Sequence, residues 1–233
     1  TVEDIQAIVE AFGHAARRAK EAGFDAIQIH GAHGFLVNQF LSPAFNKRTD
    51  AYGGDIANRT KAVLEILAKM RSRVGRDFPI LIKMNSEDFI DGGLTVGDSL
   101  EAALMLERAG IDAIELSGGT VVTGDHCRKD IDSEEKEAYW RKAAKAFKDK
   151  LSVPLILVGG IRSVPLAEKL YAQGYADYFS MSRPFIREPG LVARWASGDL
   201  RKATCRSDNL CRGPLMAGGG IYCVVEKEQQ KKA

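Results

Sequence analysis

The sequence predicts an α/β fold in which short parallel strands alternate with longer helices. Short apolar runs occur at intervals along the chain, and the segments between them have helical spacing. A third observation is an internal repeat: "AGFDAIQIHG" at 22–31 returns as "AGIDAIELSG" at 109–118 and, more weakly, as "QGYADYFSMS" at 173–182. In each copy a glycine closes a helix and the chain turns directly into an apolar run. Repeated βα units are therefore expected.

Five apolar runs are the expected strands. In chain order they are "FDAIQIHG" (24–31), "FPILIKMN" (78–85), "GIDAIELSGG" (110–119), "VPLILVGG" (153–160) and "YADYFSMSR" (175–183). Because each is almost continuously apolar, we expect strands buried on both faces. Residues 1–23 and 96–110 are the clearest helices, with Thr or Asp near the start and Gly at the end. A closed (β/α)₈ barrel needs eight strands, so either three strands lie outside this sequence or the five form an open sheet.

The composition excludes several functional classes. The 233 residues are 45% hydrophobic and 27% charged, within the ordinary globular range. Lys and Arg number 33 against 31 Asp and Glu, so no broad positive charge predicts nucleic-acid binding. No apolar run approaches the roughly 20 residues of a membrane span, and no signal peptide is evident. We therefore expect a cytoplasmic protein without membrane or nucleic-acid partners, and a solvated or disordered charged tail at 226–233.

Two neighbouring strand ends indicate a phosphate site. "LVGGIRS" ends one strand at Gly159 and Gly160, whose amides can approach an anion closely, and "SMSRP" ends the next at Ser182 and Arg183. The carboxyl ends of parallel strands share one rim, where barrel enzymes hold phosphate. The alternative is an ordinary glycine turn beside a surface arginine.

Two histidines follow the first expected strand. His30 and His33 stand among glycines, and we expect them to donate hydrogen bonds to a ligand oxygen. In the alternative, one histidine fills a core position and the other caps a loop. Metal binding is less favoured, because no third ligand has suitable spacing.

Lys83 and the cysteines are less decisive. Lys83 ends an apolar strand, where an ammonium group needs an anionic partner or must extend to water. Cys205, Cys211 and Cys223 cluster near the C-terminus, but Asp208 stands where a tight iron–sulfur motif would place a second thiol. We favour inert thiols.

The motifs resemble the old yellow enzyme family of flavin-dependent oxidoreductases, especially its bacterial branch. The resemblance spans residues 1 to about 225 and rests on "IHGAHGFLVNQFLSPAFNKRTDAYGGDIANR", "SEDFIDGGLT", "DAIELSGG", "LILVGGIRS" and "SRPFIREP". It implies a TIM barrel, (β/α)₈, of which this chain holds strands 4 to 8. Residues 1–200 would be the partial FMN-binding barrel, and residues 201–233 a C-terminal cysteine-containing extension with a charged tail.

The resemblance also implies roles for individual residues. His30 and His33 would bind the substrate oxygen, and Lys83 would lie near the pyrimidine edge of FMN. Gly160 and Arg183 would contact the FMN phosphate, with Gly159 and Ser182 beside them. In the implied reaction, NADH or NADPH reduces FMN, and the flavin passes hydride to the β-carbon of an α,β-unsaturated carbonyl compound, a small-molecule substrate with an electron-poor C=C bond.

Two departures from the family pattern shape the hypothesis. The family usually carries a proton-donating tyrosine two residues after His33, where this chain has Phe35. Strands one to three are absent, so we expect the chain to be the C-terminal part of a longer protein, associated with its missing N-terminal part or assembled as a homo-oligomer. The favoured function is an ene-reductase; the alternative is a non-catalytic half-barrel with a scaffolding or binding role.

Overall fold

Five parallel strands form one sheet in a computed structural model that describes residues 1–231. The sheet order follows the chain, and every neighbouring pair is parallel. The strands are β1 (Ile27–Gly31), β2 (Ile80–Asn85), β3 (Ala113–Ser117), β4 (Leu155–Val158) and β5 (Tyr178–Ser180). The prediction of five consecutive parallel strands from repeated βα units is confirmed.

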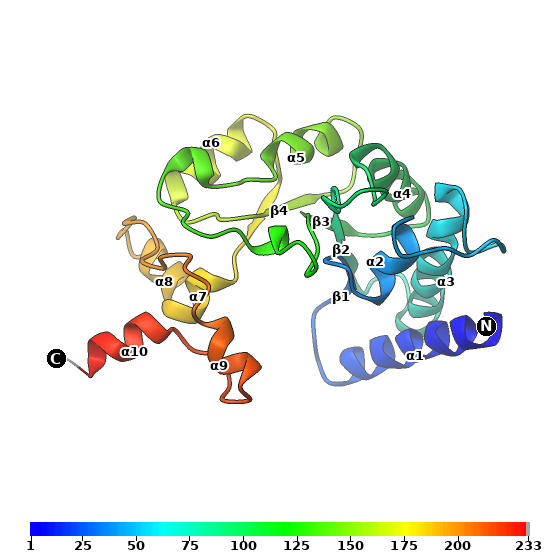
Figure 1. Ribbon diagram of the computed structural model, residues 1–233, viewed down its shortest axis with the longest axis horizontal. Helices are drawn as coiled ribbons and strands as arrows, with labels where there is room; N and C mark the ends of the chain where they lie inside the picture. The colour runs from blue at the N-terminus through cyan, green and yellow to red at the C-terminus, as the bar shows by residue number, and fades with distance from the viewer. Residues whose placement is uncertain (232–233) are drawn as a thin grey trace.

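Helices connect the strands and cover one face of the sheet (Figure 1). The connecting helices are α1 (Val2–Glu21), α2 (Leu36–Leu41), α3 (Ile56–Val74), α4 (Val96–Arg108), α5 (Arg141–Lys148) and α6 (Val164–Ala172), with short 3₁₀ turns η1 (Asp125–Cys127) and η2 (Glu134–Lys136) before α5. After β5 come α7 (Arg183–Arg187), α8 (Leu191–Ala196), α9 (Arg212–Met216) and α10 (Val224–Gln230). In the described residues no helix is both long and apolar enough to cross a membrane.

Side-chain caps fix where the longer helices begin. The Thr1 hydroxyl accepts a hydrogen bond from the Asp4 amide, and the Asp4 carboxylate accepts one from the main-chain nitrogen of Thr1. Together they form a capping box at the start of α1. Asp55 caps α3, and Thr95 caps α4 in the same way. These caps satisfy amides that have no partner inside the helix, so helix starts are locally encoded.

The hydrophobic core lies between the sheet and its helices. Alternate residues of β2, Ile80, Ile82 and Met84, are fully buried on the helix-facing side. Ile66 and Leu67 of α3 belong to the same core cluster. Burying a side chain of this size stabilises the fold by roughly 1.5–3 kcal/mol, so this layer holds the strands in register.

The expectation of strands buried on both faces is correct only for β3. All five residues of β3 are buried, but His30 of β1 is exposed, and Tyr178 of β5 is 61% exposed. The sheet has open edges and helices on only one side, so inward-facing residues near those edges meet solvent. Several inward-facing residues are polar, notably Gln28, Lys83 and Glu115, which is why apolar content overstated the burial.

The C-terminal region is helical beyond the barrel segment. Residues 227–230 of α10 are exposed and helical, which agrees with the first of the two expected alternatives, a solvated tail. Residues 232–233 lie outside the described part of the chain. The domain boundary at residue 201 stays a prediction.

Candidate active site

A buried polar network stands at the end of β2. Asn85 Nδ2 donates to Asp88 Oδ1 at 2.8 Å and to the Gly119 carbonyl at 2.9 Å. Asn38 Nδ2 donates to the same Asp88 oxygen at 3.2 Å, and the Leu94 amide donates to the other at 3.0 Å. Asn38, Asn85 and Asp88 are each 0% exposed. Because buried polar groups are costly without partners, this network fixes the loop conformations around it.

The network positions His33. The His33 amide donates to Asn85 Oδ1 at 3.1 Å, and its Nε2 lies 2.7 Å from Ser117 Oγ at the end of β3. His33 has φ of 65°, a left-handed backbone conformation that is unusual for a residue other than glycine. Burial, with smaller contributions from Lys83, His126 and His30, lowers the pKa of His33 to about 3. The imidazole is therefore neutral near pH 7.

His30 and Phe35 lie beside His33. The ring centroids of His30 and His33 are 5.4 Å apart, and those of His30 and Phe35 are 5.2 Å apart. Burial and the nearby Lys83 charge lower the pKa of His30. His33 and Phe35 line the cavity described below, whereas His30 is not among its lining residues. The structure thus groups the two histidines but gives only His33 direct access to that cavity.

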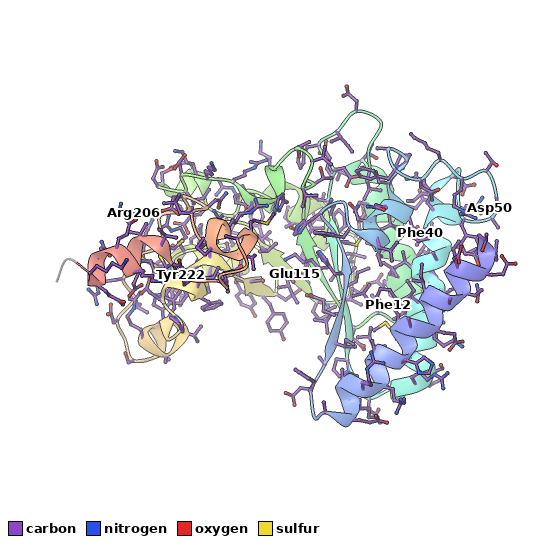
Figure 2. All side chains as sticks on the ribbon, turned by 60° about the horizontal axis from the view of Figure 1, so that its bottom comes forward. Phe12, Phe40, Asp50, Glu115, Arg206 and Tyr222 are labelled. Carbon is purple, nitrogen blue, oxygen red and sulfur yellow. The ribbon has the colours of Figure 1, made fainter. Side chains whose placement is uncertain are left out.

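Lys83 has an internal anionic partner. Its Nζ forms an ion pair of 2.8 Å with Glu115 Oε1, and the two side chains are 20% and 7% exposed. Gln28 Nε2 donates to Glu115 Oε2 at 2.9 Å. Glu115 stands near the middle of the molecule, between the helices on one side and the C-terminal segment that carries Arg206 and Tyr222 on the other (Figure 2). Extension of Lys83 to water is therefore not needed.

A cavity of about 340 Å³ brings most of the predicted residues together. Its lining includes His33, Phe35, Lys83, Gly160, Ser182 and Arg183. Gly159 does not line it; a Cβ there would lie 2.9 Å from Trp140, so this glycine allows an aromatic ring to pack against the turn. Arg183 Nη1 donates to the Arg128 carbonyl at 2.8 Å and to Asn209 Oδ1 at 2.5 Å.

The same cavity has the chemical character that FMN requires. Gly160 has φ of 77° and presents no side chain, and Arg183 and Ser182 supply phosphate donors beside it. Apolar walls from Val158, Ile161 and Met181 suit a flat ring system. The volume falls within the roughly 300–1,000 Å³ of small-molecule sites. The residues present therefore fit the flavin, and Lys83 lines the same cavity.

The four cysteines are free thiols. Cys205 and Cys211 are buried, and burial raises the pKa of Cys211. A raised pKa keeps the Cys211 thiol protonated and unreactive, which supports the interpretation of an inert thiol at that position. Within residues 1–231, no group of three or more His, Cys, Asp or Glu side chains is arranged to hold a metal ion.

Several residues of the site were not predicted from the sequence. Glu115 lies inside an apolar run, and Asn38 lies in a helix, where polar residues are common. His126 lies beside His33, with the two rings tilted and their centroids 5.3 Å apart, but it comes from a long loop. Tyr139 also lines the cavity. Only Glu115 had a usable signal: a carboxylate at the strand position that pairs in register with Lys83.

Comparison with known proteins identifies the family. A family model described as the NADH:flavin oxidoreductase / NADH oxidase family matches residues 1–201. The chain is 34% identical to an NADH oxidase of Thermoanaerobacter brockii over 251 aligned positions, which cover 100% of this chain and 38% of that protein. The chain thus spans well under half the length of this relative.

Solved structures show the same fold. A 2-naphthoyl-CoA reductase in complex with 2-naphthoyl-CoA matches with a TM-score of 0.80 and 32% identity, covering 88% of this chain and 31% of the other. Morphinone reductase in complex with tetrahydroNAD matches with a TM-score of 0.67 and 27% identity, covering 86% and 51%. The predicted partial TIM barrel is confirmed, and FMN with NADH or NADPH are the cofactors expected of such enzymes. The chain belongs to the NADH:flavin oxidoreductase / NADH oxidase family, which confirms the resemblance to old yellow enzyme.

Proposed function

We propose that this chain supplies most of the active site of an FMN-dependent NAD(P)H oxidoreductase that reduces C=C bonds conjugated to a carbonyl group. The observation that carries the proposal is a neutral, hydrogen-bonded His33 in the lining of the flavin-sized cavity that Gly160 and Arg183 also line. In the complete protein, a homo-oligomer or the remaining barrel segment would cover the open side of the sheet. The substrate is a small molecule.

Each residue has a defined task in this proposal. Arg183, Ser182 and the Gly160 amide, which line the cavity, would hold the phosphate. Lys83, its charge balanced by Glu115, would interact with the ring system. Bound FMN supplies hydride transfer.

The histidines act on the substrate rather than on the flavin. A neutral His33 can donate only through an N–H group, which stabilises charge that develops on the substrate oxygen without transferring a full proton to it. His30 flanks His33, with ring centroids 5.4 Å apart, but it does not line the cavity, so His33 is the main donor.

Two of the solved relatives support the substrate class. Morphinone reductase and 2-naphthoyl-CoA reductase are named for compounds in which unsaturated carbon adjoins a carbonyl group. A site that polarises such a carbonyl makes the conjugated carbon more electrophilic. An N–H group of His33 on the cavity wall matches that need.

The test separates the two half-reactions in the intact, FMN-loaded protein. His33→Gln should slow flavin reoxidation by 2-cyclohexenone about 10²-fold, since a lost oxyanion donor typically costs 10²–10³ in rate. Reduction by NADH should stay nearly constant in the same stopped-flow experiment. His14→Gln, which removes an exposed imidazole from α1, is the matched control. Equal rates of flavin reoxidation in His33→Gln and the wild type would contradict the proposal. A protein that binds no flavin would favour the alternative, a non-catalytic half-barrel with a scaffolding or binding role.

Phe35 tests the protonation step. Its side chain is 48% exposed on the cavity wall and has no proton to give. Phe35→Tyr adds a hydroxyl where the substrate's α-carbon is expected, and general-acid help is typically worth about 10²–10⁴-fold. Reoxidation by the enone should accelerate, with reduction by NADH unchanged. Phe24→Tyr, at a 65% exposed site before β1, is the control. If neither variant accelerates reoxidation, Phe35 does not face the α-carbon or protonation does not limit the rate.

A further inference from the structure

A second cavity adjoins the proposed flavin site. It has a volume of about 550 Å³ and is formed by the loop between β3 and α5 together with the first turn of α5. Tyr139 lines both cavities. Arg183 of the first cavity also bonds the main-chain carbonyl of Arg128, which lines the second. The two spaces therefore share a wall and a hydrogen bond.

The second cavity is strongly basic. Its lining contains one carboxylate, Glu135, and five cationic side chains: Arg128, Lys129, Lys136, Arg141 and Lys142. Lys136 pairs with Asp132 at 2.9 Å. Among the described residues, the other four cations have no carboxylate within ion-pair distance. The whole chain has a net charge of only +2, so this excess is local.

A neighbouring cavity shows that the imbalance is not general to this rim. It has a volume of about 300 Å³, and its charged lining is balanced: Asp130, Asp132 and Glu137 against Arg162, Lys202 and Arg206. There Lys202 pairs with Glu137 at 3.2 Å. The basic cavity has only Glu135 in its lining to offset five cations, and an excess of positive charge gathered in a concave site attracts an anion.

Arg128 is held in place at the edge of this cavity. Its guanidinium lies 4.6 Å from the ring centroid of Trp140, 5.1 Å from that of Tyr139 and 5.9 Å from that of Phe89. Cation–π contacts fix its position without neutralising its charge. Arg141 and Lys142 begin α5, which has no acidic residue in its first turn, so the helix dipole adds to the positive potential.

We propose that this cavity binds the phosphate groups of a nucleotide-bearing ligand whose reactive end enters the flavin cavity. The inference rests on the proposed function, because the same ligand would place its reactive end in the flavin cavity and its phosphate groups in the basic cavity. Arginine binds phosphate oxygens through paired N–H groups, and lysine contributes a point charge. Five cationic side chains against the single carboxylate of Glu135 suit a ligand with several phosphate charges better than one with a single carboxylate.

Two ligand sources share this chemistry. The reductant NADPH carries a diphosphate and an adenosine 2′-phosphate, whereas a coenzyme A thioester substrate carries a diphosphate and an adenosine 3′-phosphate. The probes that separate them are adenosine 2′,5′-bisphosphate and adenosine 3′,5′-bisphosphate, with inorganic pyrophosphate as the common element. Binding of each to the intact, FMN-loaded protein is measured by calorimetry, without turnover.

The double variant Lys129→Gln/Lys142→Gln removes two exposed cations that make no ion pair in the described structure. It should weaken binding of the preferred probe about tenfold, the scale of two screened ion pairs. The control Arg76→Gln/Lys150→Gln makes the same change in net charge at exposed positions outside the cavity and should leave affinity unchanged. Preference for one bisphosphate identifies the source of the ligand.

Three results would overturn the inference: no probe binding to the wild type, equal affinity in the cavity variant, or an equal loss in the control. Failure of the proposed function looks different. If the probes bind through Lys129 and Lys142 but NAD(P)H does not reduce the flavin, the phosphate site stands and the oxidoreductase proposal falls. If NAD(P)H reduces the flavin normally and no probe binds, the oxidoreductase proposal stands and the phosphate site falls.

Discussion

The two sides of the flavin cavity are built in different ways. On the side of β2 and β3, the polar groups Asn38, Asn85 and Asp88 are fully buried and bond to one another and to the main chain. On the side of β4 and β5, Arg183 is only partly buried and Ser182 is exposed. Arg183 is held by oxygens from two loops. One side is a preformed frame, and the other presents charge.

The difference shows what each side contributes. Every polar group in the buried network has a partner in the protein, so that side can place His33 before any ligand arrives. The positive charge of Arg183 is not neutralised in the same way. Its hydrogen-bond acceptors are neutral oxygens, and among the described residues no carboxylate pairs with it. Its charge is thus available to a bound anion. Substitutions on the first side should affect folding most, and those on the second should affect ligand retention.

The largest effect is expected for Asn85→Ala. The substitution leaves Asp88 Oδ1, the Gly119 carbonyl and the His33 amide each without one buried partner. Because each unsatisfied buried group costs about 1–3 kcal/mol, the free energy of unfolding should fall by about 3 kcal/mol or more. Urea denaturation measures it.

The matched control is Asn58→Ala, at an exposed position in α3. It should change the free energy of unfolding by less than 1 kcal/mol. Similar losses in the two variants would mean that the network does not frame the site.

An intermediate effect is expected for Arg183→Ala, with FMN retention as the measurement. Loss of a charge-assisted donor should weaken FMN binding by about 1.5–3 kcal/mol. Arg183→Lys keeps the charge but loses the paired N–H groups, so its affinity should lie between those of the alanine variant and the wild type. Arg187→Ala, on the same helix but outside the flavin cavity, is the control. Unchanged flavin affinity in Arg183→Ala would remove the phosphate assignment.

The fold was predictable because its signals are local. Apolar runs, helix spacing and the glycine before each strand identified the βα units, and parallel strands place His33, Lys83 and Arg183 on one rim whatever the details of packing. Which faces are buried was less predictable. His30 sits at an open edge of the sheet and is exposed, although the run that contains it is apolar.

The supporting residues of the site depend on contacts between distant segments. Asn209 reaches Arg183 from the C-terminal loop, and Glu115 neutralises Lys83 from the neighbouring strand. Neither contact follows from spacing within one segment. The sequence patterns therefore located most of the groups that line the cavity but not those that hold them in place.

The smallest effect, and the one most specific to the framed side, is a pH dependence that arises from His33. The pKa of an unfolded histidine is near 6.5, and burial beside Lys83 lowers that of folded His33 to about 3. Between these values the unfolded chain binds a proton that the folded chain does not. The folded state therefore loses stability as the pH falls below 6.5, at up to about 1.4 kcal/mol per pH unit. Above pH 6.5, His33 is neutral in both states, and the stability of the folded state is not reduced by its titration.

His33→Gln removes the titrating group but keeps a side chain that can bond to Ser117. Urea denaturation at pH 7 and pH 5 should show about 1–2 kcal/mol less acid destabilisation in this variant than in the wild type. The partial exposure of His33 keeps the expected value below the full linkage limit. The comparison variant is His14→Gln, in helix α1, which precedes β1 in the sequence. If it reduces the acid sensitivity as much as His33→Gln does, the dependence does not originate at the site, and the buried network does not hold His33 in its neutral form.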